Sequence, residues 1–136
     1  MISVTIPGEP VGQGRPRAAV VNGKPRMYSP KTSGDWRARA AWFMRQEVKE
    51  PLSGPLWVTI WAVFALPKSK IRKKHPLVTR TPCTKRPDID NVVKAILDAG
   101  NGILWADDAQ VYRLEVFKMY GREGESPSVI LEAREA

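Results

Sequence analysis

Five of the six aspartates in this 136-residue chain lie in one short window: Asp88, Asp90, Asp98, Asp107 and Asp108. The rest of the chain is basic, and the whole carries 22 Lys and Arg against 14 Asp and Glu, a formal net charge of +8. A basic protein attracts polyanions, most often nucleic acid. Aspartates would repel a phosphate chain unless a cation neutralised them, and carboxylate oxygens are the ligands that Mg²⁺ prefers. The pattern predicts metal-assisted hydrolysis of phosphodiesters.

Each aspartate also has an ordinary structural interpretation. Asp88 stands where a helix N-cap belongs, Asp90 and Lys94 have the spacing of a helical ion pair, and Asp107-Asp108 suits a turn. These separate interpretations must together explain five aspartates within 21 positions of a basic chain. The clustering therefore favours a functional site.

Composition limits the other kinds of chemistry. The chain has one cysteine, Cys83, and one histidine, His75, so a disulfide framework and a multi-histidine metal site are excluded. A Ser-His-Asp or Cys-His nucleophile is not indicated either, because the sole histidine and the sole cysteine both lie in the basic segment 67–87. No signal peptide and no apolar run of about 20 residues is evident. We expect one domain over residues 1–136, in a cytoplasmic protein with no membrane partner.

The elements that must position the aspartates can be predicted from periodicity and turn signals. We expect a strand over 2–7, a hairpin around Asn22-Gly23, a helix from Pro30 to about Glu50, a strand over 55–66, a helix over 89–99 and two strands over 111–121 and 127–135. On the second helix, Ile89, Val92, Val93, Ile96 and Leu97 should form the apolar face, with Asp90, Asn91, Lys94 and Asp98 opposite. This order predicts an α/β (α+β) fold with a mixed sheet and two main helices.

Residues 67–87 form a long basic loop between the second predicted strand and the aspartate helix. The loop contains Lys68, Lys70, Arg72, Lys73, Lys74, Arg80, Lys85 and Arg86 and no acidic residue. Such a run is often only a solvated surface, but its place beside Asp88 favours contact with phosphates. A second basic patch around the hairpin contains Arg15, Arg17, Lys24 and Arg26, which would bind another part of the DNA or only solvent.

The five tryptophans are Trp36, Trp42, Trp57, Trp61 and Trp105. We expect them in the core or in a dimer interface rather than as platforms for base stacking. Trp105 is the exception, because it lies three residues before Asp108.

The aspartate window also carries a family pattern. Pro87-Asp88-Ile89-Asp90-Asn91, then Lys94, then Asp107-Asp108-Ala109-Gln110-Val111, resembles the RusA family of Holliday-junction resolvases. The segment IPGEPVGQGRPR near the N-terminus is similar to the same family more weakly. The central motif is long and specific, which a lone glycine pattern is not.

The resemblance implies a homodimeric endonuclease that cuts four-way DNA junctions by paired nicks and needs Mg²⁺, with Mn²⁺ as an alternative ion. It implies metal binding by Asp88, Asp90 and Asp108, and a catalytic lysine at Lys94. Two alternatives stay open: a metal-dependent nuclease that prefers flaps, forks or single strands, and a nucleic-acid-binding module whose aspartates are structural.

Overall fold

The computed structural model describes residues 1–13, 17–21, 24–28, 31–71 and 78–136, with only the backbone described at 17–21, 24–28 and 31–33. The strands are β1 (Ile2–Pro7), β2 (Arg17–Val21), β3 (Lys24–Tyr28), β4 (Leu56–Phe64), β5 (Thr81–Pro82), β6 (Val111–Tyr120) and β7 (Ser128–Glu135). The helices are α1 (Lys31–Glu47) and α2 (Ile89–Gly100), with short 3-10 turns η1 (Lys68–Lys70) and η2 (Asp108–Gln110). In the described part, no helix has the length and apolar character needed to cross a membrane.

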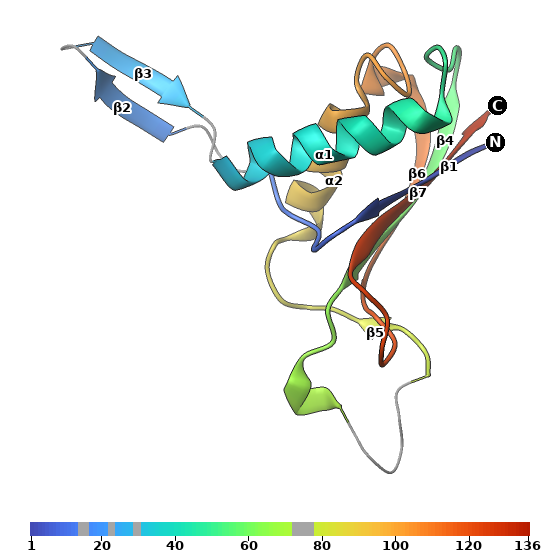
Figure 1. Cartoon of the computed structure of the whole chain (residues 1–136). Coiled ribbons are helices and arrows are strands. Elements are labelled where there is room, and N and C mark those ends of the chain that lie inside the picture. The colour runs from blue at the N-terminus through green and yellow to red at the C-terminus, as the bar shows by residue number, and fades with distance from the viewer. Residues whose placement is uncertain (14–16, 22–23, 29–30, 72–77) are drawn as a thin grey trace.

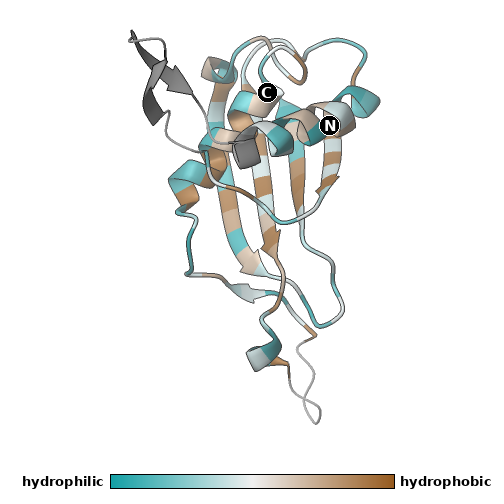
Figure 2. Cartoon of the chain, turned by 60° about the vertical axis from the view of Figure 1, so that its left-hand side comes forward, coloured by the Kyte–Doolittle hydropathy of each residue, from teal (hydrophilic) through white to brown (hydrophobic). Residues whose placement is uncertain are grey.

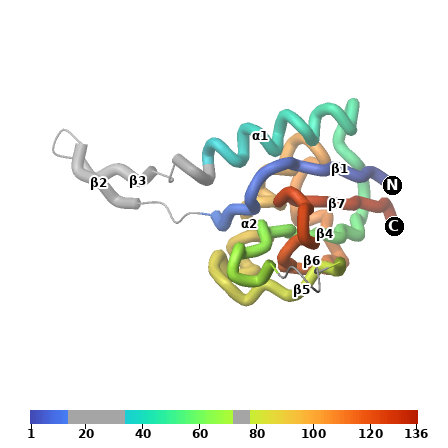
Figure 3. The backbone as a smooth tube through the Cα atoms, turned by 60° about the horizontal axis from the view of Figure 1, so that its bottom comes forward, coloured from blue at the N-terminus to red at the C-terminus, as the bar shows by residue number. Residues whose placement is uncertain are grey.

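The main sheet has the strand order β1-β7-β4-β6-β5, and β2 and β3 form a separate two-stranded sheet (Figure 1). β6 runs parallel to β4, while β7 is antiparallel to both β1 and β4. The parallel pair needs a crossover connection, and this connection contains α2. The predicted mixed sheet with two helices is therefore confirmed. Figure 3 shows β1 and β7 side by side, which brings the two termini together.

Both helices cover one face of the sheet. α1 contacts α2 and β1, and α2 contacts β6, so the two helices form one layer. Alternate residues of the central strand β4, such as Val58, Ile60 and Ala62, are buried under this layer. Figure 2 shows brown, apolar bands that alternate with paler ones along the strands of the sheet. The other face of the sheet is open in the described part and carries half-buried Trp57 and Trp61.

Arginine and aromatic side chains cover part of this open face. The guanidinium groups of Arg113 and Arg134 lie 3.9 Å and 4.4 Å from the ring centroid of Trp57, on the strands that flank β4. The ring of Trp61 stacks on Phe117 with 6.0 Å between their centroids. These contacts shield apolar rings that would otherwise face water.

The predicted apolar face of α2 is partly wrong. Val92 and Ile96 are buried as expected, and Ala95 and Ala99 join them. Ile89 is 46% exposed instead, and Val93 and Leu97 are only half-buried. The centre of the apolar face, at Val92 and Ile96, contacts the core. Apolar residues at the border of this face therefore lie beside the core rather than in it.

The predicted element boundaries agree closely with the structure, with two exceptions. α1 ends at Glu47 rather than near Glu50. The segment 67–87 is not a plain loop, because it contains η1 and the short strand β5, which pairs with β6 through Thr81 and Pro82. The hairpin is confirmed by the pairing of β2 with β3. Its Asn22-Gly23 turn, like Pro30 and residues 72–77, lies outside the described residues.

An ion pair fastens the basic segment to the turn between β6 and β7. The Arg80 guanidinium donates to both carboxylate oxygens of Glu125, and the shortest of these hydrogen bonds, from Nη2 to Oε2, is 2.7 Å long. Each side chain of the pair is 21% exposed. The Arg80 hydrogen bonds lower the pKa of Glu125 to about 2, helped by the backbone N–H of Arg122. Because Arg80 serves this pair, it is a structural residue rather than one of the expected phosphate contacts.

We expect the variant Glu125→Gln to lower the free energy of unfolding by about 1–3 kcal/mol at neutral pH. The folded-state pKa lies below the unfolded value, so this stabilisation is complete above about pH 4.5 and is lost as the pH falls toward 2. Urea unfolding at pH 7, 4.5 and 2.5 measures it. The wild type and the variant should converge at the lowest pH, and a constant difference at all three values would contradict the ion-pair interpretation.

Candidate active site

Asp88 and Asp90 lie together at the start of α2. Asp88 is the N-cap residue and its side chain makes no capping hydrogen bond, so its carboxylate is not used by the helix. The Asp90 carboxylate accepts from the backbone N–H of Asn91 at 2.9 Å. Both side chains are exposed. The positive end of the helix dipole stabilises two carboxylates at this position.

Three neighbours fix the chain around Asp88. The Lys118 ammonium, from β6, donates to the carbonyl oxygen of Pro87 at 2.6 Å and also to that of Lys85. The backbone N–H of Gln13 donates to the carbonyl of Asn91 at 2.9 Å. Gly12 lies so close that an added Cβ would be 2.8 Å from the Pro87 Cβ, so a larger residue does not fit there. The N-terminal segment and β6 therefore position the first two aspartates.

Asp108 lies at the other end of α2, in a second group of polar side chains. Burial raises the pKa of Asp108, and the neighbouring charges of Asp107 and Asp98 raise it further. A hydrogen bond from the Asn101 side chain acts in the opposite direction. Asn101 is itself oriented, because its Oδ1 accepts from the Trp105 indole N–H at 2.9 Å. Negative charge is thus crowded here without a cationic partner among these groups.

Within the Asp107-Asp108 pair, the structure assigns different tasks to the two carboxylates. Asp107 is the N-cap of η2, and its carboxylate accepts from the backbone N–H of Ala109 at 3.1 Å. Gln110 completes a capping box: its Oε1 accepts from the N–H groups of Ala106 and Asp107. The Gln110 amide also donates to the carbonyls of Leu52 and Gly54. Asp107 is occupied by the turn, which supports Asp108 as the metal ligand.

Helix α2 separates the two carboxylate groups. Asp90 and Asp98 are eight residues apart, which is about 12 Å along a helix axis. In the described part of the chain, no three acidic, histidine or cysteine side chains are close enough together to hold one metal ion. Lys94 lies between the groups, exposed and one helical turn from each of Asp90 and Asp98. One protomer thus carries two half-sites: Asp88 with Asp90, and Asp108 with its neighbours.

The donor set nevertheless suits a hard divalent cation. The ligands are oxygen atoms of aspartates that lie at or near the surface. Around Asp108, adjacent negative charges favour a proton on the carboxylate, and a metal ion would relieve the same repulsion. The chemistry of the residues fits Mg²⁺, although each half-site alone supplies too few ligands.

The structure describes only some of the residues that we expect to contact DNA. Lys85 and Arg86 are exposed, immediately before the first half-site. The Lys70 ammonium lies 4.6 Å from the ring centroid of Tyr120, with its side chain otherwise exposed. Arg72, Lys73, Lys74 and Arg15 fall outside the described residues, and Arg17 belongs to β2, of which only the backbone is described.

The structure places Trp105, whose role the sequence left open, in the core. Trp105 is fully buried, and Gly100 leaves room for its ring, since an added Cβ would be 2.6 Å from the ring. Its proximity to Asp108 reflects a structural role, because its indole orients Asn101. Sequence reasoning also missed Lys118 and Asn101. Lys118 is a single lysine within a predicted strand, and no sequence pattern marks it as functional. Gln110 belongs to the aspartate motif, but the sequence assigned it no role.

Comparisons with known proteins show two similarities. The family model "Endodeoxyribonuclease RusA" matches residues 7–131. The chain is also 38% identical over 128 residues to the uncharacterized protein YqaN of Bacillus subtilis (strain 168), an alignment that covers 90% of this chain and 89% of that protein.

Replacing Gln110 with alanine should loosen the turn that carries Asp108, because four hydrogen bonds to the backbone are lost. We expect stability to fall by about 1–3 kcal/mol and metal affinity to fall about 10-fold to 100-fold. Chemical denaturation and metal titration measure the two effects. Gln46→Ala is the matched control, since Gln46 makes one bond of 3.3 Å on exposed α1. Equal effects of the two variants would remove Gln110 from the site.

Proposed function

The chain belongs to the RusA family of endodeoxyribonucleases, and from that premise we propose that it is a Mg²⁺-dependent endonuclease that resolves four-way DNA junctions by paired nicks. The observation that carries the proposal is the presence of uncompensated carboxylates, Asp88, Asp90 and Asp108, on the helix layer of a chain with a net charge of +8. A surface that attracts phosphate around carboxylates that bind a cation is suited to phosphodiester hydrolysis.

In this proposal Asp88, Asp90 and Asp108 would hold the metal ion. A bound ion would supply an activated water and neutralise charge on the scissile phosphate. The Lys94 ammonium, between the half-sites, interacts with negative charge that grows in the transition state. Lys118 and Gln110 position the ligands by holding the backbone before Asp88 and around Asp108. Lys85 and Arg86 hold the DNA beside the first half-site.

The two half-sites require a second copy of the chain to act together. β6 pairs with β5 only at Met119 and Tyr120, so within the described chain the rest of its outer edge has no strand partner. Tyr112 and Leu114 on β6 are exposed apolar residues at this edge. An unpaired strand edge with apolar side chains is suited to pairing with another strand. We infer that two copies meet along β6 as a homodimer.

A two-fold axis perpendicular to the sheet runs the two β6 strands antiparallel. The Val111 end of β6 follows η2 and Asp108, whereas Lys118 near the other end holds the segment before Asp88. Antiparallel pairing therefore brings Asp108 of one protomer toward Asp88 and Asp90 of the partner subunit. The same axis keeps both helix layers on one side, so both completed sites face the same DNA. Two sites related by a two-fold axis match the two symmetric strands of a four-way junction.

A synthetic four-way junction incubated with and without Mg²⁺ tests the function. We expect paired nicks only with the metal, and little cleavage of flaps, forks or single strands. Asp88→Asn, Asp90→Asn and Asp108→Asn should each abolish cleavage and retain binding, because an amide is a weak Mg²⁺ ligand and adds no negative charge. Asp107→Asn should stay active, since asparagine is an equally good N-cap. Junction cleavage without divalent metal would refute the proposal.

Neutralising Lys85 and Arg86 together to glutamine should weaken DNA binding and flatten its salt dependence. Two lost phosphate contacts reduce the log–log slope by about 1.8. Fluorescence titrations from low to moderate salt provide the slopes. The matched control is Arg113→Gln with Arg134→Gln, which removes two charges from the open face of the sheet. If the control flattened the slope and the Lys85/Arg86 variant did not, DNA would lie on the wrong face in this account.

A further inference from the structure

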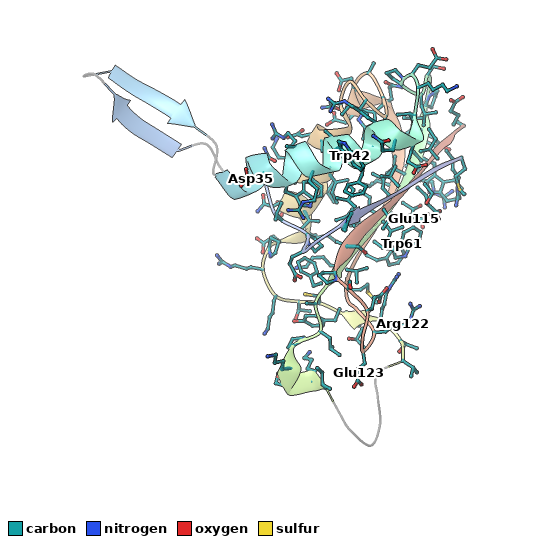
Figure 4. The ribbon with its side chains drawn as sticks, viewed as in Figure 1. Asp35, Trp42, Trp61, Glu115, Arg122 and Glu123 are labelled. Carbon is teal, nitrogen blue, oxygen red and sulfur yellow. The ribbon has the colours of Figure 1, made fainter. Side chains whose placement is uncertain are left out.

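Trp42 is exposed on the outer surface of α1. Its side chain is 57% exposed, whereas Trp36 on the same helix is 2% exposed and belongs to the core. A single exposed apolar residue is common on protein surfaces, so the charged residues around Trp42 decide what it can bind. Figure 4 shows Trp42 on α1 and Trp61 on the sheet, so the two aromatic residues belong to different layers. Trp42 takes no part in the half-sites described above.

Three cationic residues lie near Trp42 in the sequence. Arg39 and Arg45 share its face of α1, three positions before and three after it, and Lys49 follows two residues beyond the end of the helix. Arg39 is oriented by the hydrogen bond from its guanidinium to the Pro7 carbonyl at 3.0 Å, and its remaining donors can serve another partner. Asp35 is the one acidic residue on this face. The stripe therefore combines an aromatic ring with a net positive charge.

This combination fits nucleic acid better than a protein partner. A helix that docks against a protein presents several apolar anchors at i, i+3, i+4 and i+7. Among the described residues of α1, Trp42 is the only large apolar side chain that is exposed. A lone aromatic ring between cations is instead the arrangement that binds unpaired bases, through stacking on the ring and phosphate contacts around it.

The stripe leads toward the second half-site. A surface hollow is lined by Arg45, Val48, Lys49, Gly102 and Ile103, among others. Gly102 directly follows Asn101, whose side chain bonds Asp108. The backbone keeps these segments adjacent, since the N–H of Leu52 donates to the carbonyl of Leu104 at 2.7 Å. A strand that leaves Asp108 can thus continue along α1 without leaving the helix layer.

We propose that Trp42 stacks on a nucleobase that is left unstacked at the crossover of the branched DNA, while Arg39, Arg45 and Lys49 contact the phosphates on either side. This inference rests on the proposed function, because it assumes DNA on the helix layer. It adds a source of selectivity: a duplex keeps its bases stacked, whereas the crossover of a junction exposes bases to an aromatic ring. Recognition of the branch then depends on α1 and hydrolysis depends on α2.

The test compares binding of a synthetic four-way junction and of a duplex in EDTA, where no cleavage occurs. Trp42→Ala should weaken junction binding about 5-fold to 100-fold, as loss of one base–aromatic stack does. Duplex binding should change less than about two-fold, and the salt slope should stay unchanged because no charge is removed. Trp42→Phe should recover most of the affinity. Arg45→Gln with Lys49→Gln should reduce the junction salt slope by about 1.8.

Trp61→Ala is the control, since Trp61 is also a tryptophan but is half-buried on the open face of the sheet, on the inner strand β4 away from the β6 edge. It should leave junction binding unchanged, with thermal unfolding showing that each variant folds. Equal junction binding by wild type and Trp42→Ala would overturn the inference, as would a change of oligomeric state in sedimentation without a change in DNA affinity. Failure of the proposed function is separate, because then wild type itself would not cleave the junction with Mg²⁺.

Discussion

Helix α2 is part of the crossover that connects β4 to the parallel strand β6, and the rest of the structure depends on where this connection places the helix. This crossover puts the two ends of one rigid helix beside the two ends of β6. Asp88 and Asp90 are held at one end through Lys118, and Asp108 is held at the other through η2 and Gln110. A straight helix cannot bring its own ends together. The carboxylate groups at the two ends of α2 in one protomer therefore stay about 12 Å or more apart along the helix axis.

Charge determines what this arrangement can bind. The chain as a whole attracts polyanions, while the carboxylates at each end of α2 repel them until a cation is present. At one of these ends, burial raises the pKa of Asp108, and the neighbouring charges of Asp107 and Asp98 raise it further. Other charges are already used inside the fold: Arg80 pairs with Glu125, and Arg113 and Arg134 cover Trp57. We therefore propose the helix layer, rather than the open face of the sheet, as the surface that binds DNA.

Sequence patterns predicted the elements well and the site only in part. Local patterns of apolar residues predicted β1, β4, β6 and β7, and the aspartate motif supplied the candidate site residues. Both signals are local in the sequence. Sequence did not reveal that Asp88 and Asp108 lie at opposite ends of α2, since that separation depends on how β6 returns beside β4. Sequence also left the role of Trp105 open and did not distinguish a core position from a surface position for Trp42, because burial depends on which face of an element the core contacts.

The central claim is that one site is built from two copies of the chain, and complementation of inactive variants tests it most directly. Asp88→Asn protein is mixed with Asp108→Asn protein, allowed to exchange subunits, and assayed on a four-way junction with Mg²⁺. A shared site predicts that each mixed dimer regains one intact site, so single nicks appear at about a quarter of the wild-type number of sites. If each protomer holds a complete site, both sites of every mixed dimer are defective. No cleavage by the mixture, with subunit exchange demonstrated, would contradict the account.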